Sequence, residues 1–173
     1  RLGLNSVAPF DPKSKIIEYI IATAPNEPLA AMSVRAFIED VAGRSIAPGG
    51  GSASAVIAAL GTGLGAMVGK LTLGVRKFET VDAEMRKLIP PLHEATLALI
   101  PMIDEDTNAF ADYVAALGLP ENTDEENRFR KAQLQLGLKK AIEVPLSVMT
   151  MADKAWDAML GVAQYGNIAS RSD

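Results

Sequence analysis

Apolar residues recur every three or four positions through most of this chain, and the interruptions of that pattern divide it into predicted helices. Residues 33–43 predict a short helix, because Ser33 is a favourable N-cap and Gly43 is a common stop. Residues 52–73 predict one helix about 33 Å long at 1.5 Å per residue. No segment shows sustained strand alternation, apart from a few residues near the N-terminus, so the chain is expected to be all-α.

A second long helical pattern extends from residue 80 to residue 117, and prolines interrupt it at positions 90, 91 and 101. Proline removes a backbone donor, so we expect a kink or a short break near Pro90 instead of one straight rod. Thr123 and Glu126 have the spacing of a capping box, which predicts the start of a further helix. Its apolar pattern continues past Pro145. The prediction is a bundle of long, partly kinked helices around a central helix.

Small residues dominate the predicted central helix at 52–73. Gly61, Gly65 and Gly69 lie four positions apart, which lets neighbouring backbones approach closely and also occurs in pairs of membrane helices. The uncharged run from residue 49 to residue 69 is near the lower limit for crossing about 30 Å of hydrocarbon. The flanking helices are amphipathic and charged. We therefore expect the core helix of a soluble bundle and no membrane partner.

Composition narrows the chemistry that this chain can perform. Its 173 residues suffice for one domain with a proper core, and the 5% of aromatic residues favours closely packed helices. The absence of Cys excludes a disulfide framework and a Cys nucleophile and suits a reducing compartment, which we expect to be the cytoplasm. The lone His93 is expected to be a partly exposed helix residue, and no metal site is expected. The net charge of −4 argues against nucleic acid as a partner.

Three consecutive acidic residues, Asp104, Glu105 and Asp106, fall in the middle of the second long pattern. Asp106 lies four residues after Met102 and four before Phe110, where the apolar stripe predicts a core residue. Asp104 falls beside it on a more polar row, and Glu105 faces away. A carboxylate on a core stripe must be paired, protonated or facing a cavity. Asp106 is therefore either a buried residue satisfied by its neighbours or a candidate acid–base group.

Three glycines, Gly49, Gly50 and Gly51, precede Ser52 at the predicted start of the central helix. Such a run serves either a turn with positive φ or a close approach of another group to the backbone. The free N–H groups and positive end of a helix attract anions and carbonyl oxygens, so these four residues are candidates for substrate binding. Five basic residues follow the central helix: Lys70, Arg76, Lys77, Arg86 and Lys87. They form either a solvated helix end or a receiver for an anionic tail.

Several segments together resemble the formimidoyltransferase-cyclodeaminase family. They are "LGLNSVAPFDPKSKIIEYI", "APGGGSASAVIAALGTGLGAMVG", "RKLIPPLHEATLALIPMIDEDTNAFADYVAALGLPENTDEE", "LQLGLKKAIEVPLSV" and "GNIASRSD". The resemblance makes residues 1–21 the tail of a preceding transferase domain and residues 22–31 a linker. Residues 32–173 then form a helical cyclodeaminase domain that is incomplete at its C-terminal end.

This resemblance implies an ammonia-lyase within a bifunctional enzyme of folate metabolism and histidine degradation. Its substrate is a tetrahydrofolate derivative, with or without a polyglutamate tail. The reaction converts 5-formimidoyltetrahydrofolate to 5,10-methenyltetrahydrofolate and ammonia, with no metal. The family's cyclodeaminase aspartate falls on Asp106, and Asp104 is close enough in sequence for the two carboxylates to share a proton. A homodimer or higher homo-oligomer is expected.

Two alternatives to this function remain from the sequence. One is a methenyltetrahydrofolate cyclohydrolase of the same fold, which would hydrolyse the methenyl cation instead of forming it. The other is a non-catalytic helical assembly module. The transferase-like segment at residues 1–21 favours the cyclodeaminase, because fusion to a transferase makes sense for the ammonia-releasing step.

Overall fold

The computed structural model describes residues 28–45 and 47–170, and within that part the chain is helical with no strand. This confirms the predicted all-α class. The elements in chain order are α3 (Val34–Val41), α4 (Gly50–Thr72), η1 (Arg76–Val81), α5 (Asp82–Leu99), α6 (Met102–Leu117), α7 (Asp124–Tyr165) and η2 (Ile168–Ser170). The predicted transferase tail lies outside the described residues. Of the predicted linker, only residues 28–31 are described, and they form a turn.

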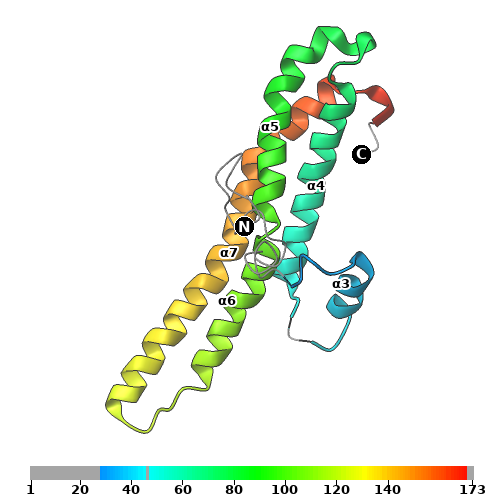
Figure 1. The fold of residues 1–173 in the computed structure, drawn as a ribbon. Coiled ribbons are helices and arrows are strands. Elements are labelled where there is room, and N and C mark those ends of the chain that lie inside the picture. Colours follow the sequence, from blue (N-terminus) through cyan, green and yellow to red (C-terminus); the bar gives the residue numbers. More distant parts are fainter. Residues whose placement is uncertain (1–27, 46, 171–173) are drawn as a thin grey trace, which may run out of the picture.

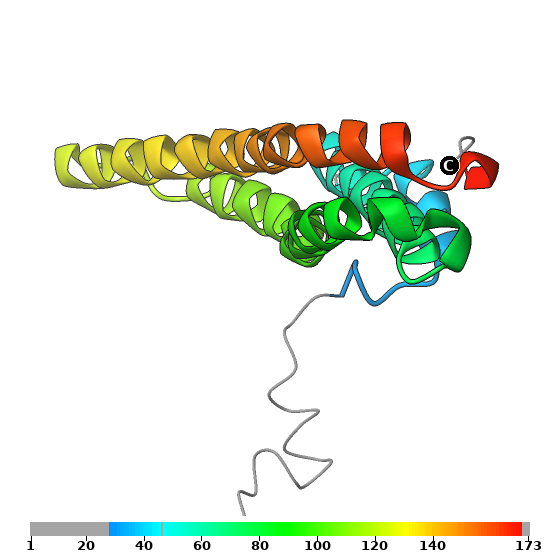
Figure 2. The ribbon, with the colours of Figure 1, turned by 90° about the horizontal axis from the view of Figure 1, so that it is seen from above.

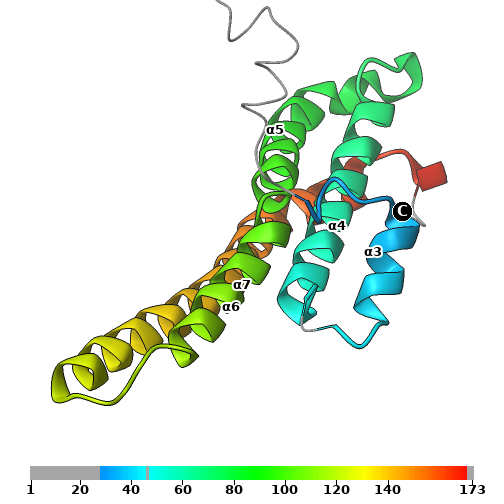
Figure 3. The same ribbon diagram turned by 60° about the horizontal axis from the view of Figure 1, so that its bottom comes forward.

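The helices form a bundle from which a two-helix arm extends. α4 and α5 are antiparallel neighbours, and the C-terminal half of α7 packs against both of them (Figure 1). α6 continues the direction of α5 away from the bundle and pairs with the N-terminal half of α7 to form the arm, as Figure 2 shows from above. The short helix α3 lies beside the N-terminal half of α4 (Figure 3).

Two clusters of buried side chains hold the bundle together. The first joins α4, α5 and α7: Ala66, Val68, Met85, Leu92, Ala155, Ala158 and Val162. The second lies near the N-terminus of α4: Ala55, Ala59, Leu99, Ile103 and Val148, with Leu29, Ala30 and Phe37 packed against it. Alanine is frequent in both clusters, and its small side chain lets the helices approach closely, as the low aromatic content predicts.

Local capping signals in the sequence are confirmed. The side chain of Ser33 accepts a hydrogen bond from the amide of Ala36 at the start of α3. At the start of α7, the Thr123 hydroxyl accepts from the amide of Glu126, and the Glu126 carboxylate accepts from the amide of Thr123. Both bonds of the capping box are therefore present. α7 then continues through Pro145 without interruption.

Of the predicted kink or short break near Pro90, the structure shows no break there, because α5 continues through Pro90 and Pro91 and the helix is broken at Pro101 instead. Pro90 and Pro91 lie inside α5, and they are exposed, so the carbonyl groups that lose their donors can accept from water. At Pro101 the chain leaves the bundle to enter the arm. The turn there is tightened by i→i+3 bonds, from Ile103 N to Ile100 O and from Asp104 N to Pro101 O, both 3.2 Å long.

The small residues of α4 have different surroundings along the helix. Gly65 and Gly69 are buried against α5 and α7, and a methyl group at Gly69 would lie 2.6 Å from Cγ1 of Ile89. A methyl group at Gly61 would meet nothing within 4 Å. Close approach between helices therefore explains Gly65 and Gly69 but not Gly61.

This difference predicts opposite effects of two matched substitutions on stability. Gly69→Ala is expected to lower the free energy of unfolding by about 1–3 kcal/mol, because the added methyl group overpacks the contact with Ile89. Gly61→Ala is expected to raise it by about 0.5–1 kcal/mol, because alanine is the better helix former and the space is open. Denaturant unfolding of both variants measures the two values, and changes of the same sign would contradict this account.

The central helix α4 is only partly enclosed in the described part of the chain. It contacts α5, α6 and α7, as predicted, but its opposite face exposes Ile57, Leu60, Leu64, Met67 and Leu71. Among the described residues, α4 is the one helix with the length and composition of a membrane span, at a mean hydropathy of 1.5. Core helices of soluble proteins share this length and composition, and 39% of the apolar stretch is buried here.

Candidate active site

The candidate site lies where the N-terminus of α4 meets the first two turns of α6. The N-cap of α4 is Gly49, which has no side chain to accept from the free amides of the helix. Asp106 on α6 supplies the missing acceptor, since its Oδ2 accepts a hydrogen bond of 2.9 Å from the backbone N–H of Ser52. The side chain of one helix therefore caps the N-terminus of another, where the helix dipole attracts negative charge.

Gly51 is the glycine that makes this contact possible. A methyl group at Gly51 would overlap the carboxylate of Asp106, lying 2.6 Å from its Oδ2. A methyl group at Gly49 would lie 3.9 Å from the same oxygen, and one at Gly50 would meet nothing within 4 Å. None of the three has a positive φ, which among the described glycines occurs only at Gly74. Of the two predicted roles for the glycine run, the structure shows close approach and not a turn.

The hydroxyl of Ser52 links the two helices a second time. Ser52 is fully buried, and its Oγ lies 2.7 Å from the carbonyl oxygen of Ile103 and 3.3 Å from Oδ2 of Asp106. It also lies 3.2 Å from Oγ1 of Thr107. A hydroxyl has one proton to donate, and the shortest contact assigns that proton to Ile103 O. The backbone N–H of Ser52 is then the principal donor to Asp106.

The two oxygens of Asp106 have different environments. Oδ2 is held by Ser52, whereas Oδ1 has no hydrogen-bond partner among the described residues. The side chain is only half-buried, and Oδ1 is not among the buried unpaired atoms of the described chain. The carboxylate is therefore fixed through one oxygen and open through the other. This is an arrangement in which a group can exchange a proton with a bound molecule.

Asp104 has a different environment, and its predicted position on a more polar row is wrong. It is only 4% exposed, and its oxygens accept from the backbone N–H groups of Leu29, at 2.8 Å, and Ala30, at 3.0 Å. The turn at residues 28–32 covers this side of α6, which the helical pattern alone could not show. Asp106, predicted on the core stripe, is the less buried of the two. No hydrogen bond joins the two carboxylates in the described structure.

Other candidate residues lie apart from Asp106. His93 is exposed, in line with its predicted position on the surface of a helix. Lys70 and the basic residues after it lie at the opposite end of α4, about 27 Å from Ser52 at 1.5 Å per residue. Within the described part of the chain no cluster of three or more His, Asp or Glu side chains could hold a metal ion.

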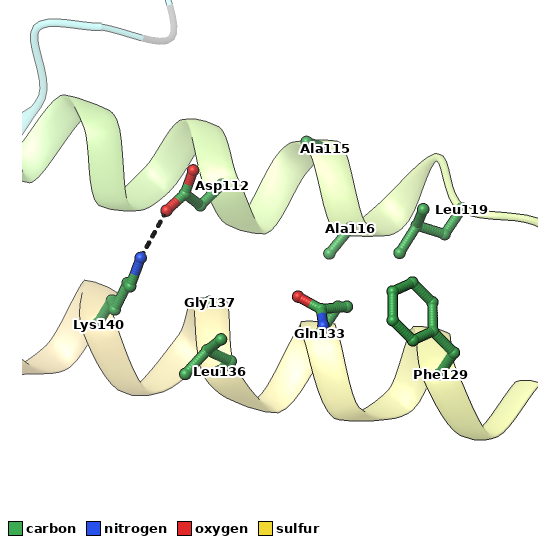
Figure 4. Close-up of a pocket in the computed structure, with 9 residues that line it drawn as sticks. All are labelled: Asp112, Ala115, Ala116, Leu119, Phe129, Gln133, Leu136, Gly137 and Lys140. Carbon is green, nitrogen blue, oxygen red and sulfur yellow. Dashed lines mark hydrogen bonds and ion pairs between the residues drawn. The ribbon is translucent and has the colours of Figure 1, made fainter.

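Two cavities lie near α6. One of about 330 Å³ lies in the arm, where Lys140 on α7 pairs with Asp112 on α6 at 2.9 Å (Figure 4). It includes none of the predicted site residues. The other, of about 390 Å³, lies between α3 and α4 and is mostly apolar. Ala53 and Ile103 line this second cavity, so it begins next to the contact between Ser52 and Asp106.

Three contributors to the site were not predicted from the sequence. The amides of Leu29 and Ala30 lie 75 and 74 residues from Asp104, and nothing in the local pattern indicates that pairing. Nothing in the sequence pattern indicates that Thr107 contacts Ser52. One signal was available for the cap itself, because a helix that begins with glycines lacks its own N-cap side chain and needs an acceptor from elsewhere.

The fold and the site define an all-α protein whose candidate chemistry is acid–base catalysis by a carboxylate at a helix N-terminus. The chain belongs to the formiminotransferase-cyclodeaminase family, because the sequence model of that family matches residues 33–173. The family predicted from the sequence is thereby confirmed.

Two similar proteins from other organisms agree with this family assignment. The chain is 47% identical over 174 residues to formimidoyltransferase-cyclodeaminase of Rattus norvegicus. It is 51% identical over 175 residues to the protein of that name from Dictyostelium discoideum. Each match covers the whole chain but only 32% of the relative, so the chain spans about a third of these relatives' length.

A shorter protein and a solved structure each match 82% of the chain. Methenyltetrahydrofolate cyclohydrolase of Methylorubrum extorquens is 36% identical over 141 residues, covering 82% of this chain and 68% of the relative. The crystal structure of formiminotetrahydrofolate cyclodeaminase from Thermotoga maritima is similar with a TM-score of 0.68 at 28% identity. That similarity covers 82% of this chain and 67% of the other.

Proposed function

We propose that this chain is part of a cyclodeaminase that converts 5-formimidoyltetrahydrofolate to 5,10-methenyltetrahydrofolate and ammonia. The observation that carries the proposal is the carboxylate of Asp106, held through Oδ2 by Ser52 with Oδ1 open. Family membership and the solved cyclodeaminase of the same fold support it. The sequence resemblance also leads us to expect that Asp106 is the family's cyclodeaminase aspartate.

The proposed reaction needs one group that can accept and return a proton. Nitrogen 10 of the folate attacks the amidine carbon carried on nitrogen 5, so a carbon–nitrogen bond forms. The bond from that carbon to the terminal amidine nitrogen then breaks, and ammonia leaves. Asp106 takes the proton from nitrogen 10 and returns it to the departing nitrogen, which balances the reaction without net uptake of a proton. Its negative charge also stabilises the cationic amidine and the methenyl product.

The structure changes what we propose for the four residues at the start of α4. Gly51 and Ser52 face Asp106, so their proposed role is to place the carboxylate and not to bind the substrate directly. A side chain at Gly50 would point into open space, and one at Gly49 would only reach ordinary contact with Asp106. Gly49 and Gly50 therefore remain the proposed points at which a flat folate ring approaches the backbone.

The wider setting of the reaction is also a proposal. The bifunctional relatives support a lyase joined to a transferase. We further propose that the reaction belongs to histidine degradation and takes place in the cytoplasm. The substrate is a folate with or without a polyglutamate tail, and the protein forms a homodimer or a higher homo-oligomer. Asp106 and proximity of the reacting nitrogens supply the chemistry, so the proposed reaction requires no metal.

A methenyltetrahydrofolate cyclohydrolase is the second candidate, because a protein of that name is 36% identical over 141 residues. The natural-length protein should be assayed with 5-formimidoyltetrahydrofolate, following ammonia release and methenyl absorbance together. A cyclodeaminase gives both signals in equal amounts. A cyclohydrolase gives neither and instead removes the absorbance of added 5,10-methenyltetrahydrofolate. A protein that does neither is a non-catalytic helical module, and the proposal is then wrong.

A further inference from the structure

Asp104 makes an unusual pair of contacts for a residue in the first turn of a helix. Its Oδ1 accepts from the backbone N–H of Leu29 and its Oδ2 from that of Ala30, at 2.8 and 3.0 Å. The two donors are consecutive residues of one turn, which is closed by a hydrogen bond of 3.1 Å from Met32 N to Leu29 O. One carboxylate thus binds two neighbouring amides of a segment that is 75 residues away in the chain.

These contacts distinguish Asp104 from Asp106. Asp104 is 4% exposed, and each of its oxygens already has a donor, so its burial is compensated within the described structure. Asp106 is half-buried and leaves one oxygen without a donor among the described residues. The two carboxylates of α6 therefore differ. Both oxygens of Asp104 accept hydrogen bonds from backbone amides, whereas Oδ1 of Asp106 is open.

The turn that Asp104 holds lies at the point where the chain enters the helical domain. The family match begins at residue 33, whereas the bifunctional relatives match the whole chain, including residues 1–32. The side chains of Leu29 and Ala30 also pack against the second core cluster, which includes Ile103 of α6. The entering segment is therefore held by polar contacts to the first turn of α6 and by apolar contacts to the second core cluster.

We propose that Asp104 is a positioning residue that clamps the entering segment at residues 28–32 onto the first turn of α6, and that it does not carry the reaction's proton. The proposal rests on the proposed function only in assigning the proton to Asp106. The clamp fixes α6 on one side, while Ser52 holds the same helix through Asp106 on the other. It thereby joins residues 28–32 to the helix that carries the chemistry.

The test separates the two carboxylates by amide hydrogen exchange and by turnover, in the natural-length protein. Asp104→Asn keeps the shape but loses one acceptor and the charge, so exchange at the amides of Leu29 and Ala30 should accelerate about 10- to 100-fold. Its kcat should stay within about tenfold of the wild type, because the proton carrier is untouched. Asp106→Asn should show the opposite pattern, with low turnover and normal protection at Leu29 and Ala30. Glu105→Gln, at the exposed carboxylate between them, is the matched control and should change neither.

A second variant reaches the clamp from its other side. Ala30 is the second residue of the turn closed by Met32 N and Leu29 O, where proline is favoured, so Ala30→Pro deletes one donor without touching the carboxylate. It should accelerate exchange at the Leu29 amide even if Asp104→Asn does not fold, and unchanged exchange would overturn the proposal. If Asp104→Asn lowers kcat as far as Asp106→Asn does, the kcat of Ala30→Pro decides between the two roles of Asp104. A loss of kcat in Ala30→Pro that matches the loss in Asp104→Asn supports positioning. A normal kcat in Ala30→Pro shows that Asp104 acts in the chemistry. Full turnover by Asp106→Asn would instead reject the assignment of the proton to Asp106 and leave the exchange result intact.

Discussion

Asp106→Asn in the natural-length protein is expected to lower kcat for cyclodeamination by about 10²- to 10⁴-fold, the usual contribution of one positioned acid–base group. The amide keeps the shape of the side chain and can still accept from the N–H of Ser52 through its oxygen. It cannot take a proton from nitrogen 10 or carry negative charge beside the cationic amidine. Steady-state assays of ammonia release and methenyl absorbance measure the loss.

Binding provides the control for this variant. Folate affinity should stay within a few-fold of the wild type, because we expect the flat ring to contact the backbone near Gly49 and Gly50 and not Asp106 alone. If Asp106→Asn and Asp104→Asn lose kcat equally, and exchange at the amides of Leu29 and Ala30 is not accelerated, the two carboxylates work as one unit. Wild-type turnover in Asp106→Asn would remove Asp106 from the mechanism.

Gly51→Ala is expected to reduce turnover by about 10²-fold or more, approaching the loss in Asp106→Asn. The added methyl group would occupy the space of the Asp106 carboxylate, so either the side chain leaves its hydrogen bond with Ser52 or α6 moves away from α4. Overpacking of this kind also costs about 1–3 kcal/mol in the free energy of unfolding. Turnover and denaturant unfolding measured on one preparation test both expectations.

Gly50→Ala is the matched control, since it adds the same group one residue away, where nothing lies within 4 Å. Its stability should equal or exceed that of the wild type, because alanine is the better helix former. Any loss of activity in Gly50→Ala would then come from the bound folate and would appear in KM before kcat. If Gly51→Ala retained full activity, the close approach of Asp106 would have no part in catalysis.

Helix starts were predictable where the capping side chain and the backbone amide it binds lie within a few residues of each other. Ser33 and the pair Thr123 and Glu126 cap helices through bonds that span three residues, so the sequence alone located both starts. The break in the 80–117 pattern was predicted at the wrong proline, because the solvent exposure of a proline decides whether the helix can continue through it. Pro90 and Pro91 are tolerated on a solvated face, whereas Pro101 falls where α6 turns away from the bundle.

The candidate site was predicted only as far as helical periodicity reaches. Periodicity identified Asp106 as out of place on an apolar stripe, and the glycines indicated either a turn or a close approach at the start of α4. It could not show that those two features meet each other, because 54 residues separate Ser52 from Asp106. The burial of Asp104 depends on a turn 75 residues away, and no local pattern contains that information.

The two helices of the arm differ mechanically. α7 is a single 42-residue rod, about 63 Å long at 1.5 Å per residue, that runs through both the bundle and the arm. The opposite side is formed by two helices, because α5 ends at Leu99 and α6 starts at Met102. Pro101 has no backbone N–H to donate, so we expect this side of the molecule to be less stiff at Ile100 and Pro101 than within α5 or α6. The break between α5 and α6 lies less than two turns before Asp106, so a change in the angle between these two helices would move the Asp106 carboxylate relative to α5.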